Sequence, residues 1–254
     1  MTIASGEQRT PASALAVRRR IRIGRLGRAG WRLALVLVVL AGLVLALASV
    51  TTPSVDDAAT RVTVLDTAHG SVPVPVSAAE RIAVAVVAAE DGRFYSHHGV
   101  DTLGVVRALW GRLTGTDAGG STLDQQLAHV VYEPAASGVW ARVDEVAISL
   151  KLEGHYSKQA ILDLYLNAVY FGHGYYGIGA ASRGYFGITP AQLSWGQAAL
   201  LAGLLQAPSQ LDPIQHLTAA LARRQYVFGR LVDTGALTAA RARQLEADPL
   251  ALRR

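Results

Sequence analysis

The sequence predicts a mainly α-helical protein with one membrane-spanning helix near its N-terminus. A long uncharged apolar stretch follows a basic tail. Beyond it, apolar residues recur at helical spacing in one segment after another. Several of these segments open with Ser or Thr followed three residues later by Glu or Gln, the signature of a capping box. Only Arg61 to Leu65 alternates as a strand would.

Residues 33–52 form the predicted transmembrane helix, because no charged residue interrupts the stretch from Leu33 to Val55. Residues 1–32 carry eight arginines and a single acid, and acids follow the stretch at Asp56 and Asp57. This asymmetry predicts a cytoplasmic N-terminal tail and an extracytoplasmic remainder at the cell membrane. Two alternatives are a cleaved signal peptide, with Ala46-Leu47-Ala48 as the small-x-small site, and a buried core helix.

Composition excludes some classes of function. The whole chain has a net charge of +5, which is less than the excess of arginine in the tail alone. The remainder is therefore slightly acidic, which argues against nucleic-acid binding. The chain has no cysteine, so disulfides and thiolate metal sites are excluded.

A linker with a short strand is predicted for residues 53–76, and one helical domain for residues 77–248. Within this domain, hydroxyl residues are placed to cap helices at Ser77, Thr122, Ser157, Ser194 and Thr238. Glycine-rich stretches at 115–120 and 172–179 separate the helical segments.

Glu90 and Asp91 end an apolar helix just before Gly92. The negative end of the helix dipole raises the pKa of a carboxyl there, which favours a role in proton transfer. The alternative is a helix-end network with Arg93 or a histidine. For the adjacent His97 and His98, a structural role is favoured over a metal site.

A second segment runs from Gly119 to Gln126 as Gly-Gly-Ser-Thr-Leu-Asp-Gln-Gln. Its glycines allow close backbone approach, and the free amides of the following helix N-terminus form an anion site. An ordinary capped helix is the alternative. A third segment places Arg142 and Glu145 on one helix face, as a binding pair or as a solvated ion pair.

Together these segments resemble the signatures of glycosyltransferase family 51, which forms peptidoglycan transglycosylases and the transglycosylase module of penicillin-binding proteins. The resemblance extends over roughly residues 65–240. It implies a lysozyme-like domain with a smaller jaw subdomain that dips into the bilayer, for which the apolar face of residues 104–113 is suited. A plain core helix is an equal alternative for that segment.

The resemblance implies polymerisation of lipid II into glycan strands with inversion and release of undecaprenyl diphosphate. Glu90 matches the general base, and Glu145 matches a second essential glutamate near the donor diphosphate, where a divalent cation (Mg²⁺ or Mn²⁺) is expected. No organic cofactor is expected. Expected partners are lipid II, the growing glycan, the membrane and other cell-wall synthesis proteins. The expected substrate- and diphosphate-binding residues are Asp91, Phe94, His98, Gly120, Ser121, Thr122, Gln125, Gln126, His129, Arg142, Tyr165, Asn167 and Tyr170.

Several positions depart from the family pattern, among them Gly154 and His155 in place of a basic pair, and Gly179 and Gln197 in place of glutamates. Asp124 replaces a threonine, His129 replaces a lysine expected to contact phosphate, and Ala141 replaces an arginine. These changes leave open a catalytically weakened protein that binds lipid II or acts as a cell-wall scaffold. A muramidase is a further alternative, because the fold is shared with lysozymes.

Overall fold

The computed structural model describes residues 11–75, 77, 79–114, 120–133 and 137–253, with side chains omitted for 11–29, 109 and 112–114. Two compact units are distinguished, residues 1–47 and residues 48–254. The described part of the chain contains helices and no β-strand. Isolated β-bridges join His98 to Val100 and Tyr170 to Tyr176. The mainly α fold class is confirmed.

The first helix is α1 (Pro11–Thr51), and its segment Gly30–Thr51 is 22 residues long with a mean hydropathy of 3.0. By length and composition this segment can cross a membrane. Its side chains are largely exposed, with only 6% of the most apolar window buried. That exposure argues against the alternative of a buried core helix.

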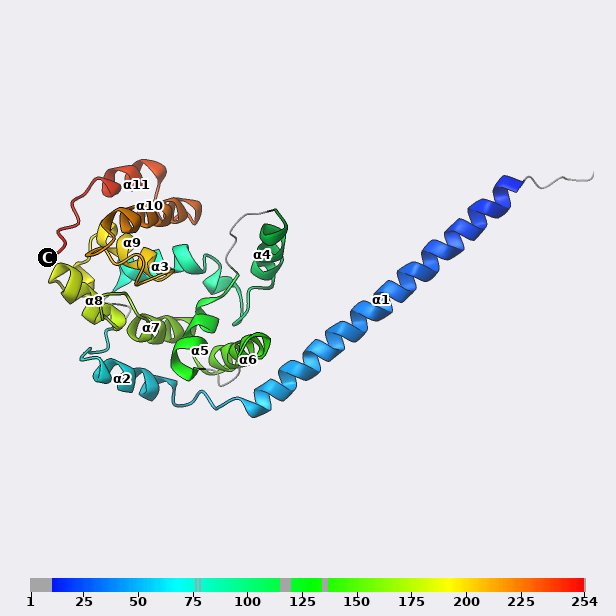
Figure 1. Cartoon of the computed structure of the whole chain (residues 1–254), viewed down its shortest axis with the longest axis horizontal. Helices are drawn as coiled ribbons and strands as arrows, with labels where there is room; N and C mark the ends of the chain where they lie inside the picture. The colour runs from blue at the N-terminus through cyan, green and yellow to red at the C-terminus, as the bar shows by residue number, and fades with distance from the viewer. Residues whose placement is uncertain (1–10, 76, 78, 115–119, 134–136, 254) are drawn as a thin grey trace, which may run out of the picture. The chain divides into compact units, whose positions relative to one another are not determined.

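The second unit is built from two groups of packed helices (Figure 1). In one group α9 packs against α3 and α10, and α11 packs against α10. In the other, α5 packs against α6 and α7, and α2 and α8 pack against α7. The bounds are α2 (Ala58–Ala68), α3 (Glu80–Glu90), α4 (Thr102–Thr114), α5 (Leu123–Tyr132), α6 (Val139–His155), α7 (Lys158–Ala168), α8 (Gly177–Phe186), α9 (Trp195–Leu204), α10 (Leu217–Asp233) and α11 (Ala239–Glu246), with short 3-10 turns η2 (Phe94–Ser96) and η3 (Pro190–Gln192).

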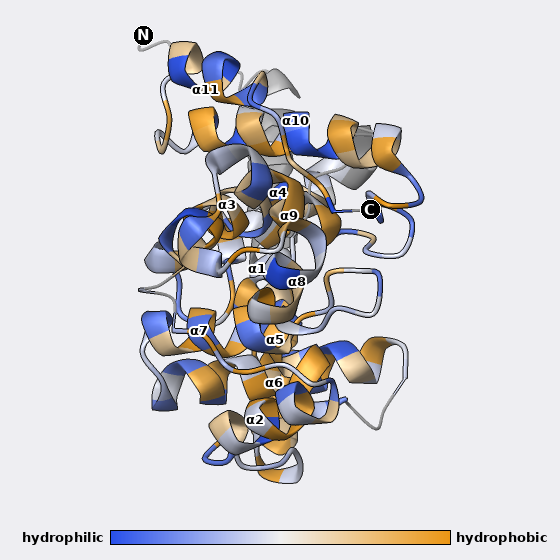
Figure 2. Ribbon diagram, turned by 90° about the vertical axis from the view of Figure 1, so that its left-hand side faces the viewer, coloured by the Kyte–Doolittle hydropathy of each residue, from blue (hydrophilic) through white to orange (hydrophobic). Residues whose placement is uncertain are grey.

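Helix α9 is the hydrophobic centre of its group, and every residue from Gly196 to Leu204 is buried. Figure 2 shows the contrast with α10, in which hydrophobic and hydrophilic segments alternate. On α10 the buried residues Val227, Phe228 and Leu231 recur at helical spacing, so one face of the helix packs inward. This packing carries the remaining face of α10 to the side of the molecule where α3 ends.

The strand predicted at Arg61 to Leu65 is wrong, because these residues lie within helix α2. Val62 and Asp66, four residues apart, are both buried, and α2 packs on α7 and α5. Packing of one helical face thus outweighs the β-branched residues that suggested a strand. Residues 53–76 therefore include a helix of the folded unit and are not a plain linker.

Most predicted caps are confirmed, and one is wrong. Ser157, Ser194 and Thr238 each accept a hydrogen bond from the backbone at the start of their helices. Ser77 does not cap α3, because that helix starts after Ala79 without any side-chain cap. The turn preceding α3 is instead packed into the core through Ala79, which is 1% exposed.

Helix α4 presents apolar side chains outward. Leu103, Val106 and Trp110 are 56%, 64% and 68% exposed. This exposure argues against a plain core helix for residues 104–113. The side chains of Leu109 and Leu113, which belong to the expected apolar face, and of Arg112, which was expected to reach lipid phosphates, lie outside the described residues.

Candidate active site

Glu90 is the last residue of α3, and its side chain is 14% exposed. Its Oε2 accepts a hydrogen bond of 3.1 Å from Nε2 of Gln126 on α5. Its Oε1 lies 3.9 Å from Nη2 of Arg223 on α10 and has no hydrogen-bond partner in the structure. One oxygen of this carboxylate is thus oriented by the protein, and the other is buried without a hydrogen bond.

Burial raises the pKa of the Glu90 carboxyl, while the hydrogen bond from Gln126 and the charge of Arg223 act in the opposite direction. The neighbouring Asp91 adds to the increase. A carboxyl with a raised pKa is a stronger base once ionised, so these surroundings suit a general base. The expected direction of the pKa shift is confirmed, with burial as its main cause.

Tyr165 fixes the side-chain amide of Gln126. Its O–H donates to Oε1 of Gln126 over 2.6 Å, so the NH₂ group of the amide must face Glu90. Tyr165 is fully buried, and burial together with the charge of Glu90 raises its pKa well above the ordinary value. The phenol therefore remains a donor, and Tyr165 acts on Glu90 through Gln126 instead of contacting a sugar.

Glu145 on α6 has a side chain that is only 4% exposed, and each oxygen contacts a basic group. Nδ1 of His129 lies 2.8 Å from Oε1, and Nη1 of Arg142 donates to Oε2 over 2.7 Å. These two partners are 68% and 72% exposed. Glu145 thus holds two basic side chains at the surface, where they can meet an anion.

Helix α5 brings the two glutamates together. Gln126 contacts Glu90, and His129 contacts Glu145. Because Gln126 and His129 are three residues apart on one helix, they are neighbours on its surface, with Cβ atoms about 5–6 Å apart. The two acids, 55 positions apart in the sequence, therefore each contact the same face of α5.

Three backbone amides at the N-terminus of α5 are already bonded within the protein. Thr122 and Gln125 form a complete capping box, which engages the amide of each. The amide of Leu123 donates to Oδ2 of Asp91 over 3.1 Å. Asp91 is itself the anion at this helix end, so an external anion would meet amides that are already bonded. Ser121 remains exposed next to them.

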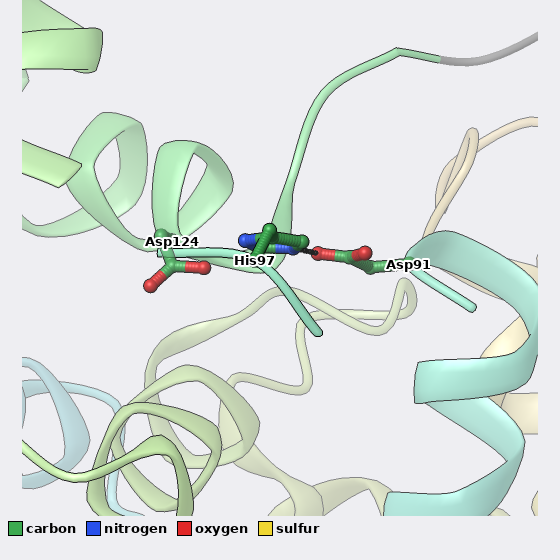
Figure 3. A group of neighbouring side chains, drawn as sticks. All are labelled: Asp91, His97 and Asp124. Carbon is green, nitrogen blue, oxygen red and sulfur yellow. Dashed lines mark hydrogen bonds and ion pairs between the residues drawn. The ribbon is translucent and has the colours of Figure 1, made fainter. Parts of the chain in front are cut away.

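His97, and not His98, is the histidine that contacts Asp91, next to Glu90. Its Nε2 lies 2.9 Å from Oδ2 of Asp91, and its side chain is 4% exposed. Figure 3 shows the ring of His97 between the carboxyls of Asp91 and Asp124. The side chain of His98 is 93% exposed and lies 3.4 Å from Glu153. Of two adjacent histidines, the sequence could not tell which one points inward.

Several residues expected to contact substrate are part of the scaffold. Phe94 is fully buried beneath Nζ of Lys158, 4.3 Å from the ring centroid. Asn167 exchanges two hydrogen bonds with the backbone of Val74, at 2.8 and 3.0 Å. The hydroxyl of Tyr170 accepts from the amide of Gly174. Gly120 packs closely on α4, because a Cβ there would lie 2.8 Å from that of Ala108.

A cavity of about 360 Å³ opens beside Glu90. The C-terminal end of α3, the residues just before α5, the start of α4 and one face of α10 line it. From α10 come Tyr226, Arg230 and Asp233, which the sequence analysis missed together with Arg223. Arg223, Tyr226 and Arg230 recur at helical spacing on an amphipathic segment, which is the signal that could have found them.

The residues around Glu145 do not fit a resident divalent cation. Both of its oxygens already contact basic side chains, and Mg²⁺ prefers a set of oxygen ligands. Within the described residues, the one group at metal-ligand spacing is Asp91, His97 and Asp124. There, Oδ2 of Asp91 is already used by His97 and by the amide of Leu123.

In this helical fold two buried glutamates, Glu90 on α3 and Glu145 on α6, both contact side chains of α5, and this arrangement defines the candidate active site. A sequence model described as Transglycosylase matches residues 61–232. The chain therefore belongs to the transglycosylase family, glycosyltransferase family 51. The resemblance stated from the sequence motifs is confirmed.

Curated relatives are penicillin-binding proteins. The chain is 40% identical over 168 residues to penicillin-binding protein 1A of Vibrio cholerae, which covers 65% of this chain and 20% of the relative. It is 43% identical over 162 residues to penicillin-binding protein 1A of Mycolicibacterium smegmatis, covering 61% and 21%. Penicillin-binding protein 1F of Bacillus subtilis is 40% identical over 170 residues, covering 65% and 24%. The chain thus spans about a fifth of the length of these relatives.

A solved structure of penicillin-binding protein 1A from Haemophilus influenzae aligns with a TM-score of 0.37 and 27% identity. That alignment covers 52% of this chain and 16% of the other.

Proposed function

We propose that this chain is an inverting peptidoglycan glycosyltransferase that polymerises lipid II and releases undecaprenyl diphosphate. The observation that carries the proposal is the carboxylate of Glu90, buried beside a cavity, with one oxygen oriented by Gln126 and the other without a hydrogen bond. Membership of the transglycosylase family supports the choice of reaction.

In the proposed reaction, the carboxylate of Glu90 takes the proton from the sugar hydroxyl of an incoming lipid II. The oxygen of this sugar hydroxyl attacks the anomeric carbon of the growing glycan and forms the new glycosidic bond. The bond from the anomeric carbon to the diphosphate oxygen breaks, and its electron pair leaves with the diphosphate. A single base opposite the leaving group is consistent with inversion.

The exposed basic side chains of Arg142 and His129, which contact Glu145, would stabilise the leaving diphosphate. Arg142 supplies a permanent charge, and His129 supplies one when protonated. Their contacts with Glu145 hold both groups in place before the substrate arrives, so little reorganisation is needed as the negative charge develops. No step of the proposed reaction involves a metal ion, because the side chains around Glu145 do not fit one.

The proposed location is the cell membrane, with α1 as a single span and residues 56–254 outside the cytoplasm. The eight arginines before the apolar stretch and Asp56 and Asp57 after it support this orientation. The exposed apolar residues of α4 support a contact of the jaw subdomain with the bilayer. Lipid II, the growing glycan and other cell-wall synthesis proteins are the proposed partners.

The test is glycan polymerisation from labelled lipid II by detergent-purified full-length protein, with Glu90→Gln as the matched variant. The amide keeps the shape of the side chain and removes its basicity, so we expect a rate loss of about 10²–10⁴-fold. Lipid II binding without any polymer would favour the scaffold function, and soluble muropeptides released from purified sacculi would favour a muramidase.

A further inference from the structure

Lys151 on α6 holds the segment that directly follows α1. Its Nζ lies 2.8 Å from the carbonyl oxygen of Thr52, 2.9 Å from Oγ1 of Thr52 and 3.0 Å from the carbonyl oxygen of Pro53. An ammonium has three donors, and these contacts use all of them. Carbonyl groups at the end of a helix lack intrahelical partners and carry partial negative charge, so a cation stabilises them.

Two further residues of the same region hold the next part of the segment. The hydroxyl of Tyr156 lies 3.0 Å from the carbonyl of Val55 and 3.3 Å from that of Asp56. Nδ1 of His155 lies 3.3 Å from a carboxylate oxygen of Asp56. Val55 is 4% exposed and belongs to the hydrophobic core. We call the contacts of Lys151, His155 and Tyr156 with residues 52–56 the juxtamembrane clasp.

The clasp lies entirely within the compact unit of residues 48–254. Its backbone acceptors follow a helix segment that is long and apolar enough to span a membrane. Pro53 restricts the chain further, because its ring fixes the backbone angle φ. Residues 52–56 are therefore held firmly against α6 and do not form a free tether.

The same helix carries the proposed diphosphate-binding residues. Glu145 and Arg142 precede Lys151 by six and nine residues on α6, roughly 9 and 14 Å along the helix axis. These are distances along the helix axis, so the difference in height between the residues depends also on the tilt of α6. The polar layer on each side of a bilayer is about 5–8 Å thick. A diphosphate bonded directly to a lipid tail must lie in or next to this layer.

We propose that the juxtamembrane clasp positions α6 at the depth of the lipid-linked diphosphate, with Lys151 as the main positioning residue. This inference rests on the proposed function, because a substrate held in the bilayer is what makes the height of α6 matter. Lys151 does not touch the reacting atoms and acts through the placement of Glu145 and Arg142. Without the clasp, residues 52–56 would let the domain move to heights at which these side chains miss the diphosphate.

The experiment compares Lys151→Met with wild-type full-length protein in two media. In liposomes that contain lipid II the substrate has a fixed depth, whereas in detergent micelles it does not. We expect Lys151→Met to lose roughly tenfold of its polymerisation rate in liposomes and less than about twofold in micelles. Lys151→Arg retains donors and should recover most of the liposome rate. Arg243→Met, an exposed cation on α11, is the matched control and should change neither rate.

A second readout does not depend on activity. The chain has no cysteine, so a single dye can be attached through Ala240→Cys at an exposed position of α11. Energy transfer from this dye to labelled lipid headgroups should show one narrow distribution of heights in wild type and a broader one in Lys151→Met. Equal height distributions in the two proteins would refute the positioning role of the clasp, whether or not wild type makes polymer. Absence of polymer from wild type would refute the proposed function. An equal loss of rate in both media, with a lower melting temperature, would reduce Lys151 to a folding role.

Discussion

Arg223 and Arg224 are neighbours on α10 whose guanidinium groups serve different parts of the fold. Arg223 stacks on the ring of Tyr226, 4.1 Å from its centroid, and reaches to 3.9 Å from Glu90. Arg224 donates to the carbonyl of Glu246, the last residue of α11, over 2.8 Å. At the scale of the residue, Arg223 influences the proposed base Glu90, whereas the adjacent Arg224 stabilises the packing of α10 on α11.

Arg223→Gln should therefore change the pH dependence of polymerisation. Without the nearby cation the pKa of Glu90 rises further, so the base is protonated at a higher pH and the acid limb of the rate profile moves toward neutral. We expect a loss of roughly three- to tenfold at the acid edge and a smaller loss on the plateau. The measurement is the rate as a function of pH. Arg224→Gln is the control, and an equal displacement in that variant would contradict the assignment.

At the scale of the element, α5 organises the site. Its first residues bind Asp91, its second turn orients Glu90 through Gln126, and its last turn carries His129. Thr122 starts the helix, because its Oγ1 accepts from the amide of Gln125 and donates to the carbonyl of Gly99 over 2.7 Å. Thr122 is 1% exposed, so water cannot replace these bonds.

Thr122→Ala should destabilise the protein by about 1–2 kcal/mol. It should also lower the polymerisation rate, because Gln126 and His129 lose their fixed positions. The comparison is Thr238→Ala, which removes the cap of α11 at an exposed position and should cost about 0.5–1 kcal/mol without affecting the rate. Thermal unfolding and lipid II turnover of both variants provide the test. A rate loss in Thr238→Ala of the same size would show that capping acts only through global stability.

At the scale of the whole molecule, two buried carboxyls outside the proposed chemistry control how stability depends on pH. Burial raises the pKa of Asp66 and of Asp124 to about 6. Their contribution to the free energy of unfolding is fully present below about pH 4 and is lost as the pH rises through about 6. Asp57 and Glu153 act in the opposite direction. The hydrogen bond from Arg61 lowers the pKa of Asp57, and, although burial opposes it, Lys158 lowers that of Glu153.

The double variant Asp66→Asn and Asp124→Asn should become more stable relative to wild type as the pH rises from 4 to 7. The gain in the free energy of unfolding should be on the order of 3 kcal/mol, because the amide side chains do not ionise in their buried sites. Lys158 keeps Glu153 as a partner at 2.7 Å, so the second substitution does not leave it unpaired. Denaturant midpoints at several pH values measure the difference. Parallel curves for the two proteins would show that these carboxyls do not govern the pH dependence.

Short-range sequence patterns were sufficient to predict most helices of the domain and most of their caps. The capping box of Thr122 and Gln125 and the caps at Ser157, Ser194 and Thr238 depend on residues within one turn of each other, so the sequence contains all the information they need. Helix α2 was missed because its β-branched residues alternate like a strand. Its helical form depends on burial of Val62 and Asp66 against distant helices.

For the site, residue identity determined the candidates, and tertiary packing decided their roles. By itself the sequence determined the family, the apolar span and the two glutamates, because each depends on residue types at short spacing. Only the fold decided that His97 faces inward, that Asp91 occupies the start of α5, and that Arg223 approaches Glu90. The physical reason is that these contacts join helices far apart in the chain, where burial and direction depend on how the helices pack.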